Sequence, residues 1–275
     1  MRNEEIAPKI YFMNVEAPLV AKKAEAGQFV IVRVDERGER IPLTLVDWDR
    51  ETGVITLVYQ AVGLTTRKLS EKREGEHILD VVGPLGNPGA AEKFGTVAVI
   101  GGGVGVSAAY PRAKQLKQKG NHVISIIGAR SSNILIFEEE MRSVSDELYI
   151  STDDGTKGRK GFVSDVLRDL LQGGRKIDYV FAVGPTVMMR AVAKVTKEYQ
   201  VKTDVSLNPI MVDGTGMCGA CRVRVGGETK FTCVDGPEFD GHQVDFEELL
   251  TRLNTYREEE AIALERYVKR GGGED

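Results

Sequence analysis

The stretch Thr96-Val-Ala-Val-Ile-Gly-Gly-Gly-Val-Gly105 decides the fold of the central part of this 275-residue chain. Its first five residues are a continuous apolar run, which is typical of a strand buried on both faces of a parallel sheet. The turn that follows comprises Gly101, Gly102, Gly103, Val104 and Gly105, and a helical pattern begins directly after it. A glycine turn between a strand and a helix lets the backbone approach a pyrophosphate, whereas a plain tight turn is the alternative. Because of its strand–turn–helix context, we predict a dinucleotide site here.

The same alternation of strands and helices continues from Gly95 to about Val205. Further apolar strands are predicted at 123–127, 148–151, 179–183 and 201–205, and helices at 107–119, 138–144, 163–171 and 186–199. Strands that alternate with helices indicate right-handed crossovers and a parallel sheet covered by helices. We therefore expect an α/β nucleotide-binding domain over residues 95–205.

Three further groups of residues follow predicted strands, at the carboxyl ends where open α/β sheets bind ligands. They are Arg130, the pair Asp153 and Asp154, and the turn Gly184-Pro185. No acidic residue ends the second strand, and Arg130 could reach a 2′-phosphate, so the sequence does not choose between NAD and NADP. For the aspartates and the Gly-Pro turn, the alternative is an ordinary turn without a ligand.

Residues 1–94 have an all-β pattern. Short β-branched or alternating runs occupy 6–15, 28–34, 54–60 and 77–82, and turn signals such as Thr52-Gly53 separate them. This spacing predicts a small closed barrel. The breaker cluster Gly83-Pro-Leu-Gly-Asn-Pro-Gly89 is the expected linker to the second domain.

The barrel sequence holds two candidate phosphate-binding motifs. Arg40 offers a planar fork of donors, and Pro42 fixes φ so that backbone groups can be presented to a flat ring. Gly63, Thr65 and Thr66 could form a phosphate nest at the start of a short helix at 66–70. Composition alone does not decide between this nest and a surface turn.

All three cysteines of the chain follow the α/β region, within the segment 206–240. They lie in Asp213-Gly-Thr-Gly-Met-Cys218-Gly-Ala-Cys221, then eleven residues, then Cys233. Plant-type 2Fe–2S ferredoxins have this spacing with cysteine at the first position, which Asp213 occupies here. The pattern predicts a 2Fe–2S site held by Asp213, Cys218, Cys221 and Cys233. A zinc site is the alternative, because Cys and Asp also bind Zn²⁺.

The tail, residues 241–275, is charged and helix-prone, with leucines at helical spacing. We expect it to cap the barrel or to contact a partner, and we expect Gly271–Asp275 to be disordered. The three histidines, His77, His122 and His242, lie in unrelated contexts and are expected to be structural or exposed rather than catalytic.

Composition restricts the partners and the compartment. Net charge is −4 without a basic tract, so neither nucleic acid nor an anionic membrane is an expected partner. No apolar run approaches the roughly 18 residues of a membrane span, and the N-terminus lacks the apolar region of a signal peptide. Clustered thiols without an even disulfide framework fit a reducing compartment. We expect a soluble cytoplasmic protein.

Taken in order, the motifs resemble the ferredoxin–NADP reductase superfamily. The series consists of Arg40-x-Pro42-x-Thr44, Gly63–Thr66, Gly83-Pro84-Leu85-Gly86, Gly101–Gly105, Thr152–Gly155, Gly184-Pro185 and the trailing cysteine motif. Within the superfamily, the chain is similar to the group that contains the electron-transfer subunit of dihydroorotate dehydrogenase. That group also contains the small subunit of NADH-dependent reduced ferredoxin:NADP oxidoreductase, related to the sulfide dehydrogenase small subunit.

The resemblance, which extends to about residue 240, implies a β-barrel FAD domain, an α/β parallel-sheet NAD(P) domain and a small C-terminal 2Fe–2S segment. It implies that FAD contacts Arg40, Pro42, Leu43, Thr44, Val58, Tyr59, Gln60, Gly63, Thr65 and Thr66. A nicotinamide nucleotide would bind across the second domain. Asp213 departs from the dihydroorotate-type subunits, which resemble this chain but have cysteine at that position. An aspartate there resembles the pattern of the ferredoxin:NADP oxidoreductase small subunit.

The implied function is electron transfer between NAD(H), or NADP(H), FAD and the cluster. The acceptor would be a larger flavin and iron–sulfur subunit in a heterodimer, with ferredoxin served indirectly and electron bifurcation expected. The cofactors carry the chemistry, and no side chain is needed as a nucleophile. The alternatives are a subunit of dihydroorotate dehydrogenase or of a sulfur oxidoreductase and, from a different class, a non-catalytic nucleotide-binding protein with structural zinc.

Overall fold

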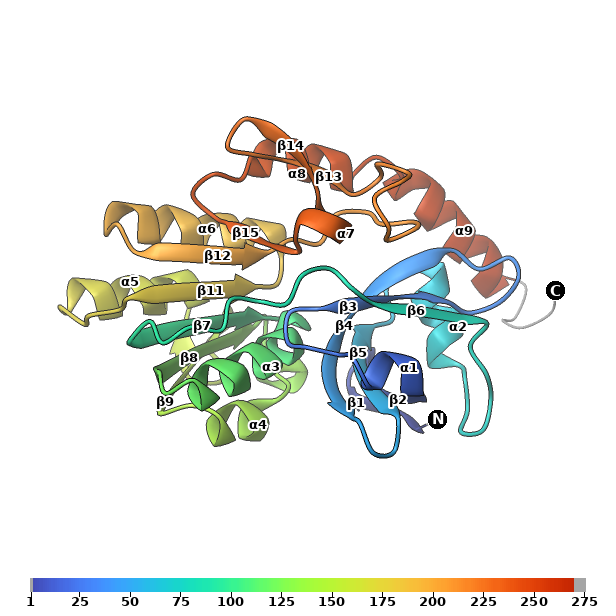
Figure 1. Ribbon diagram of the computed structural model, residues 1–275, viewed down its shortest axis with the longest axis horizontal. Coiled ribbons are helices and arrows are strands. Elements are labelled where there is room, and N and C mark those ends of the chain that lie inside the picture. The colour runs from blue at the N-terminus through green and yellow to red at the C-terminus, as the bar shows by residue number, and fades with distance from the viewer. Residues whose placement is uncertain (1, 270–275) are drawn as a thin grey trace.

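The computed structural model describes residues 2–269, which form a curled antiparallel sheet, a mainly parallel sheet and a small hairpin (Figure 1). The first sheet has the strand order β1-β2-β5-β4-β3-β6, the second β10-β9-β8-β7-β11-β12-β15, and the hairpin is β13-β14. This architecture confirms the predicted fold class of a β-barrel followed by an α/β domain and a small C-terminal segment.

Every pair of neighbouring strands in the barrel is antiparallel. Its elements are β1 (Arg2–Ala7), β2 (Ile10–Glu16), α1 (Pro18–Ala21), β3 (Phe29–Arg33), β4 (Arg40–Asp49), β5 (Val54–Gln60), α2 (Leu64–Ser70) and β6 (Asp80–Leu85). Alternate residues of the strands, among them Val30, Leu45 and Leu57, fill its interior. The strands at 28–34 and 54–60 and the helix near 66–70 confirm the predictions.

Three expectations for the barrel were wrong. The run 6–15 is not one strand but a hairpin, because Pro8 interrupts it and Lys9 turns the chain with φ of 61°. The last strand continues to Leu85, so Gly83 and Pro84 belong to a strand and only the rest of the breaker cluster is linker. Among the described strands no pairing joins β1 to β6, so the hydrogen-bonded ring is open where closure was expected.

The second sheet confirms each predicted strand and helix to within two residues. Its elements are β7 (Thr96–Gly102), α3 (Gly105–Gln118), β8 (His122–Ala129), η1 (Ser132–Ile134), α4 (Glu138–Ser143), β9 (Glu147–Thr152), β10 (Arg159–Lys160), α5 (Val163–Gln172), β11 (Tyr179–Val183), α6 (Thr186–Glu198) and β12 (Lys202–Ser206). Ala98 and Ile100 pack towards α5 and α6, whereas Val97 and Val99 pack towards α3 and α4. Both faces of β7 are therefore buried, which explains its unbroken apolar run.

The cysteine segment and the tail lie along one side of both sheets (Figure 1). They contain β13 (Arg222–Val225), β14 (Glu228–Phe231), α7 (Thr232–Asp235), β15 (Glu238–Asp240), α8 (Phe246–Leu253) and α9 (Arg257–Lys269). The tail reaches the barrel as expected, because α9 packs on α2 and Tyr267 donates a hydrogen bond to Glu71 Oε2 at 2.5 Å. The expectation for Gly271–Asp275 lies outside the described residues.

The four-part division at 1–94, 95–205, 206–240 and 241–275 remains a proposal. One strand of the third part, β15, pairs antiparallel with β12 and completes the sheet of the second part. The cysteine segment is thus joined to the nucleotide domain by strand pairing as well as by chain continuity. None of the helices within residues 2–269 has the length and apolar character needed to cross a bilayer.

Candidate cofactor sites

The glycine turn after β7 and the Gly184-Pro185 turn after β11 touch each other. A Cβ at Gly105 would lie 2.7 Å from Gly184 Cα, so the two backbones are in direct contact. Gly103, with φ of 57°, has no atom within 4 Å of the place where its Cβ would stand. The structure thus brings two predicted nucleotide motifs together at one sheet edge and leaves open space beside Gly103, as a pyrophosphate requires.

Arg130, Asp153 and Asp154 also lie at this edge, at the ends of β8 and β9. The backbone N–H of Asp153 donates to Ala129 O at 3.1 Å, and that of Asp154 donates to Arg130 O at 3.2 Å. Asp154 is engaged in its own turn, because its Oδ1 accepts from both the hydroxyl and the N–H of Thr156, which hold the pKa of Asp154 below its usual value. Arg130 and Asp153 are exposed and face solvent.

On β4, the predicted flavin residues alternate between the two faces of the strand. The side chains of Ile41 and Leu43 pack into the barrel core, which places Arg40, Pro42 and Thr44 on the opposite face. Leu43 could therefore contact a flavin only through its backbone. Its assignment as a flavin contact stays a prediction, and the side chains of Arg40, Pro42 and Thr44 form a row on the opposite face of the strand.

On β5, two of the predicted residues are buried. Tyr59 lies in the barrel core, where its hydroxyl donates to Asn3 Oδ1 at 3.0 Å and burial raises its pKa. Val58 packs in the cluster that joins the barrel to α3. Of the three, only Gln60 keeps a partly exposed side chain. A flavin contact of Val58 or Tyr59 would therefore be made through the backbone, and the assignment of all three residues stays a prediction.

The turn before α2, where a phosphate nest was predicted, is held by hydrogen bonds to Thr66. The hydroxyl oxygen of Thr66 accepts hydrogen bonds from Gly63 N at 3.0 Å and from Val62 N at 3.1 Å. Thr65 is buried and contacts Glu39 Oε2 at 3.4 Å. Of the residues predicted for the nest, only Gly63 has its N–H engaged by this side chain, and the choice between a phosphate nest and a surface turn stays a prediction.

The four predicted cluster ligands lie in two pairs. Cys221 Sγ is 3.2 Å from Cys233 Sγ, and Cys218 Sγ is 3.3 Å from Asp213 Oδ1. All three thiols are free, and burial, followed by the neighbouring Cys221, raises the pKa of Cys233 to about 12. Within residues 2–269, no three His, Cys, Asp or Glu side chains converge as ligands of one metal ion. Two pairs fit the two irons of a 2Fe–2S cluster better than one tetrahedral zinc.

The loop between the ligands is organised around Asp213. Its carboxylate accepts hydrogen bonds from the backbone N–H groups of Thr215, Met217 and Cys218 at 3.1–3.2 Å. The first of these is the largest cause that holds the pKa of Asp213 below its usual value. Asp213 is therefore an anionic ligand candidate, and it also shapes the loop that carries Cys218.

The buried cysteine pair packs directly against the barrel. Cys221 and Cys233 share a cluster with Phe29 and Ile31 of β3 and with Met211. Sequence reasoning missed these barrel residues, because an alternating strand pattern does not reveal what covers its outer face. The contact brings the predicted cluster segment and the predicted flavin barrel together.

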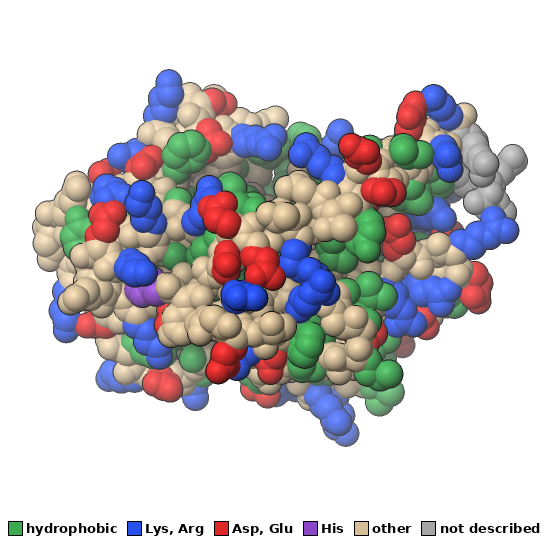
Figure 2. Space-filling view, turned by 90° about the horizontal axis from the view of Figure 1, so that it is seen from above, with side chains coloured by type: hydrophobic (Ala, Val, Ile, Leu, Met, Phe, Trp, Pro, Cys, Tyr) green, Lys and Arg blue, Asp and Glu red, His purple; other side chains and the backbone are tan. Residues whose placement is uncertain are grey.

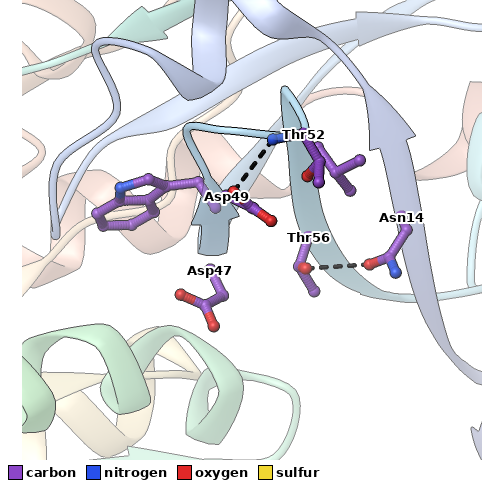
Figure 3. Close-up of a pocket in the computed structure, with 7 residues that line it drawn as sticks. Asn14, Asp47, Asp49, Thr52 and Thr56 are labelled. Carbon is purple, nitrogen blue, oxygen red and sulfur yellow. Dashed lines mark hydrogen bonds between the residues drawn. The ribbon is translucent and has the colours of Figure 1, made fainter.

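The pocket in Figure 3 lies elsewhere, at the β4–β5 hairpin. Its volume is about 370 Å³, and none of the predicted site residues lines it; the lining residues are Asn14, Asp47, Trp48, Asp49, Thr52, Val54 and Thr56. Asp49 accepts from the N–H groups of its own turn, and Asp47 lies 3.4 Å from Lys114 Nζ of α3. Both carboxylates of the pocket therefore already have partners within the protein.

Figure 2 shows the molecule from above the view of Figure 1, the side on which the cysteine segment and the tail lie, and basic and acidic side chains are interspersed there.

Comparisons with known proteins agree with this arrangement. A model of the iron–sulfur cluster binding domain of dihydroorotate dehydrogenase B matches residues 208–245. A Thermotoga maritima homolog of the dihydroorotate dehydrogenase B (NAD(+)) electron transfer subunit is 51% identical over 272 residues, covering 99% of this chain and 96% of the relative. The electron transfer subunit from a Geobacillus species is 38% identical over 253 residues, covering 89% of this chain and 96% of the relative.

Among solved structures, one from work on electron bifurcation by NADH-dependent reduced ferredoxin-NADP oxidoreductase superposes with a TM-score of 0.92. It is 50% identical, and the match covers 97% of this chain and 96% of that chain. An Amycolatopsis cytochrome P450 reductase, at 23% identity and a TM-score of 0.61 over 72% of this chain and 64% of that chain, shares the fold. The resemblance inferred from the motifs is confirmed. The chain belongs to the family of electron-transfer subunits of oxidoreductases that includes those of dihydroorotate dehydrogenase B.

Proposed function

We propose that this chain is the NAD(H)-dependent electron-transfer subunit of a ferredoxin:NADP(H) oxidoreductase, with a larger flavoprotein as its partner in a cytoplasmic heterodimer. The similarity to a structure from the NADH-dependent ferredoxin-NADP system, at 50% identity over 97% of the chain, supports this assignment. The three free cysteines support the compartment. NADP(H) remains the alternative nucleotide because Arg130 is exposed at the end of β8.

The observation that carries the proposal is the position of the cysteines relative to β4. Cys221 and Cys233 pack on Phe29 and Ile31 of β3. In the antiparallel β3–β4 pair, Phe29 is opposite Thr44 and Ile31 is opposite Pro42. Because paired strands lie about 4.8 Å apart, the Arg40–Thr44 row is one strand away from the residues that contact the buried thiols.

The residues present fit the proposed cofactors. When bound, FAD would exchange a hydride with the nicotinamide and single electrons with the cluster. The turn at Gly103 would hold the nucleotide pyrophosphate through backbone N–H groups, and the donor fork of Arg40 would bind a flavin phosphate. Asp213, Cys218, Cys221 and Cys233 would hold the cluster. The packing of Phe29 and Ile31 excludes water between the thiols and the barrel.

Dihydroorotate dehydrogenase is the second candidate, because the Geobacillus relative carries that name. We propose that Asp213 discriminates between the two, since the dihydroorotate-type subunits resemble this chain but have cysteine at that position.

A visible absorption spectrum of anaerobically purified protein, before and after addition of NADH, tests the proposal. We expect flavin bands with a red-extended iron–sulfur shoulder, both bleached by NADH, and slower bleaching by NADPH. A colourless protein that contains zinc would refute the electron-transfer function. Bleaching by NADPH alone would refute the nucleotide assignment but not the redox function.

A further inference from the structure

A buried ion pair lies outside the sites described above. Arg112 Nε is 2.7 Å from Glu238 Oε1, and the two side chains are 0% and 9% exposed. Apart from that guanidinium, neither carboxylate oxygen of Glu238 has a hydrogen-bond partner in the described part of the chain. A buried charge is costly unless it is paired, so each member of this pair depends on the other.

Arg112 belongs to the buried face of α3, among Ala108, Ala109, Ala113 and Leu116. From there its Nη2 donates to Ala90 O at 3.0 Å, a carbonyl of the linker between the two domains. Its Cζ is 5.1 Å from the ring centroid of Phe181 in β11, a cation–π distance. The guanidinium therefore contacts the linker and the central sheet in addition to Glu238.

Two glycines leave the room that the pair occupies. A Cβ at Gly89 in the linker would stand 2.3 Å from Arg112 Cζ, and a Cβ at Gly27 before β3 would stand 2.8 Å from Glu238 Oε1. Gly89 N also donates to Ala26 O at 2.9 Å. The pair thus lies where the barrel, the linker, α3 and β15 meet.

Glu238 is the first residue of β15, which follows the helix that carries Cys233 after only Gly236 and Pro237. The same stretch is held from the linker, because Asn87 N donates to Gly236 O at 2.7 Å and Asn87 Nδ2 donates to Val234 O at 3.0 Å. The residues directly after Cys233 are therefore fixed to the rest of the molecule through Asn87 and Glu238.

We propose that Arg112 and Glu238 are positioning residues that hold the cysteine segment at a set distance from the face of β4 that carries Arg40, Pro42 and Thr44, where the flavin is proposed to bind. The proposal rests on the proposed electron-transfer function. The positioning role differs from a purely stabilising one, because the rate of electron tunnelling falls exponentially with distance. That rate is therefore sensitive to a small displacement that leaves the fold intact. With both cofactors bound, one electron would pass from the reduced flavin, which would be oxidised by one electron, to the cluster, which would be reduced by one electron.

The test compares Glu238→Gln and Arg112→Lys with a matched control, Glu198→Gln, which breaks the exposed Arg168–Glu198 pair of 2.8 Å between α5 and α6. Stopped-flow mixing of the FAD- and cluster-loaded chain with NADH records flavin and cluster bleaching separately. Because the tunnelling rate falls exponentially with the distance between the cofactors, we expect cluster bleaching to slow several-fold in both variants. Flavin bleaching should keep its rate, and the control should resemble wild type.

Hydrogen exchange of the apo-protein gives a readout without cofactors. We expect the amides of residues 232–240 to exchange faster in Glu238→Gln and Arg112→Lys, but not in Glu198→Gln. Faster exchange together with an unchanged cluster rate, or flavin and cluster rates lowered by the same factor, would overturn the proposal in favour of a structural brace.

Should the Glu238 and Arg112 variants not fold, Asn87→Ala decides, because it removes only one exposed hydrogen bond to the same stretch; an unchanged cluster rate there would overturn the proposal. If NADH bleaches neither chromophore in wild type, the proposed function fails and the proposed role in electron transfer fails with it. The exchange data would then still show whether the pair holds residues 232–240.

Discussion

Substitution of Gly214 by alanine should detach the cysteine loop from the barrel. Gly214 follows Asp213 directly and has φ of 77°. A Cβ there would stand 2.6 Å from Leu85 Cδ1 and 2.9 Å from Ile31 Cγ1, two side chains of the barrel surface that the cysteine segment covers. The added methyl group would therefore push the loop away from the barrel or displace well-packed side chains.

The expected cost has two parts. An L-residue at a left-handed φ costs about 1–2 kcal/mol, and overpacking a filled contact costs about 1–3 kcal/mol. Gly227 provides the matched control, since it has φ of 81° in the β13–β14 turn but no atom within 4 Å of its Cβ position. Gly227→Ala should thus cost the first part alone, and the difference between the variants measures the contact with the barrel.

Calorimetry of the two apo-variants under the same conditions measures that difference. At about 2–4 °C per kcal/mol, we expect Gly214→Ala to melt about 2–12 °C below Gly227→Ala. After reconstitution, Gly214→Ala should also retain less iron per chain than the control. Equal Tm values and equal iron content in the two variants would refute the docking contact.

Three further predictions follow from the sites. Asp213→Cys should give a four-thiolate visible spectrum and Asp213→Ala a chain that loses iron on gel filtration; unchanged iron and spectrum in Asp213→Ala would end the ligand assignment. Gly103→Val should raise the Kd for NADH at least about tenfold, or about 1.4 kcal/mol, because its side chain enters the open space of the turn; calorimetric titration giving the wild-type Kd would contradict this. Burial raises the pKa of Glu238 from 4.5 to about 7, although Arg112 opposes the rise. The stability that Glu238 contributes is therefore present below about pH 4.5 and lost as the pH rises through about 7. Urea titrations should show the free energy of unfolding of wild type falling relative to that of Glu238→Gln between these two pH values. A difference between the two proteins that does not change with pH would disprove it.

The α/β half of the molecule could be predicted from local patterns. A strand buried on both faces must be apolar throughout, as Thr96–Ile100 is, and each intervening helix must show one buried stripe. The ligand spacing from Asp213 to Cys233 is likewise a local property of the chain. These features depend on residues close in sequence, so the α/β domain and the candidate cluster ligands could be predicted from them.

The barrel was harder to predict because strand pairing there is non-local. Pro8 and Lys9 divide an alternating run into two strands, yet the run is continuous in its apolar pattern. The β6 strand enters a cluster of glycine and proline because β3 offers it hydrogen bonds there, with Phe29 paired to Leu85. A weak local preference for turns was overridden by a partner strand that lies about fifty residues away.

The site shows the same division. The sequence by itself determined which residues are candidate ligands and which turns approach a nucleotide, because residue type, spacing and backbone freedom are properties of short segments. Only the tertiary structure decided that Tyr59 and Leu43 belong to the core, that the ligands form two pairs, and that the thiols rest on β3. The pair of Arg112 and Glu238 was likewise found only in the folded chain, because the two residues are far apart in sequence and the cost of burying a charge depends on its neighbours in space.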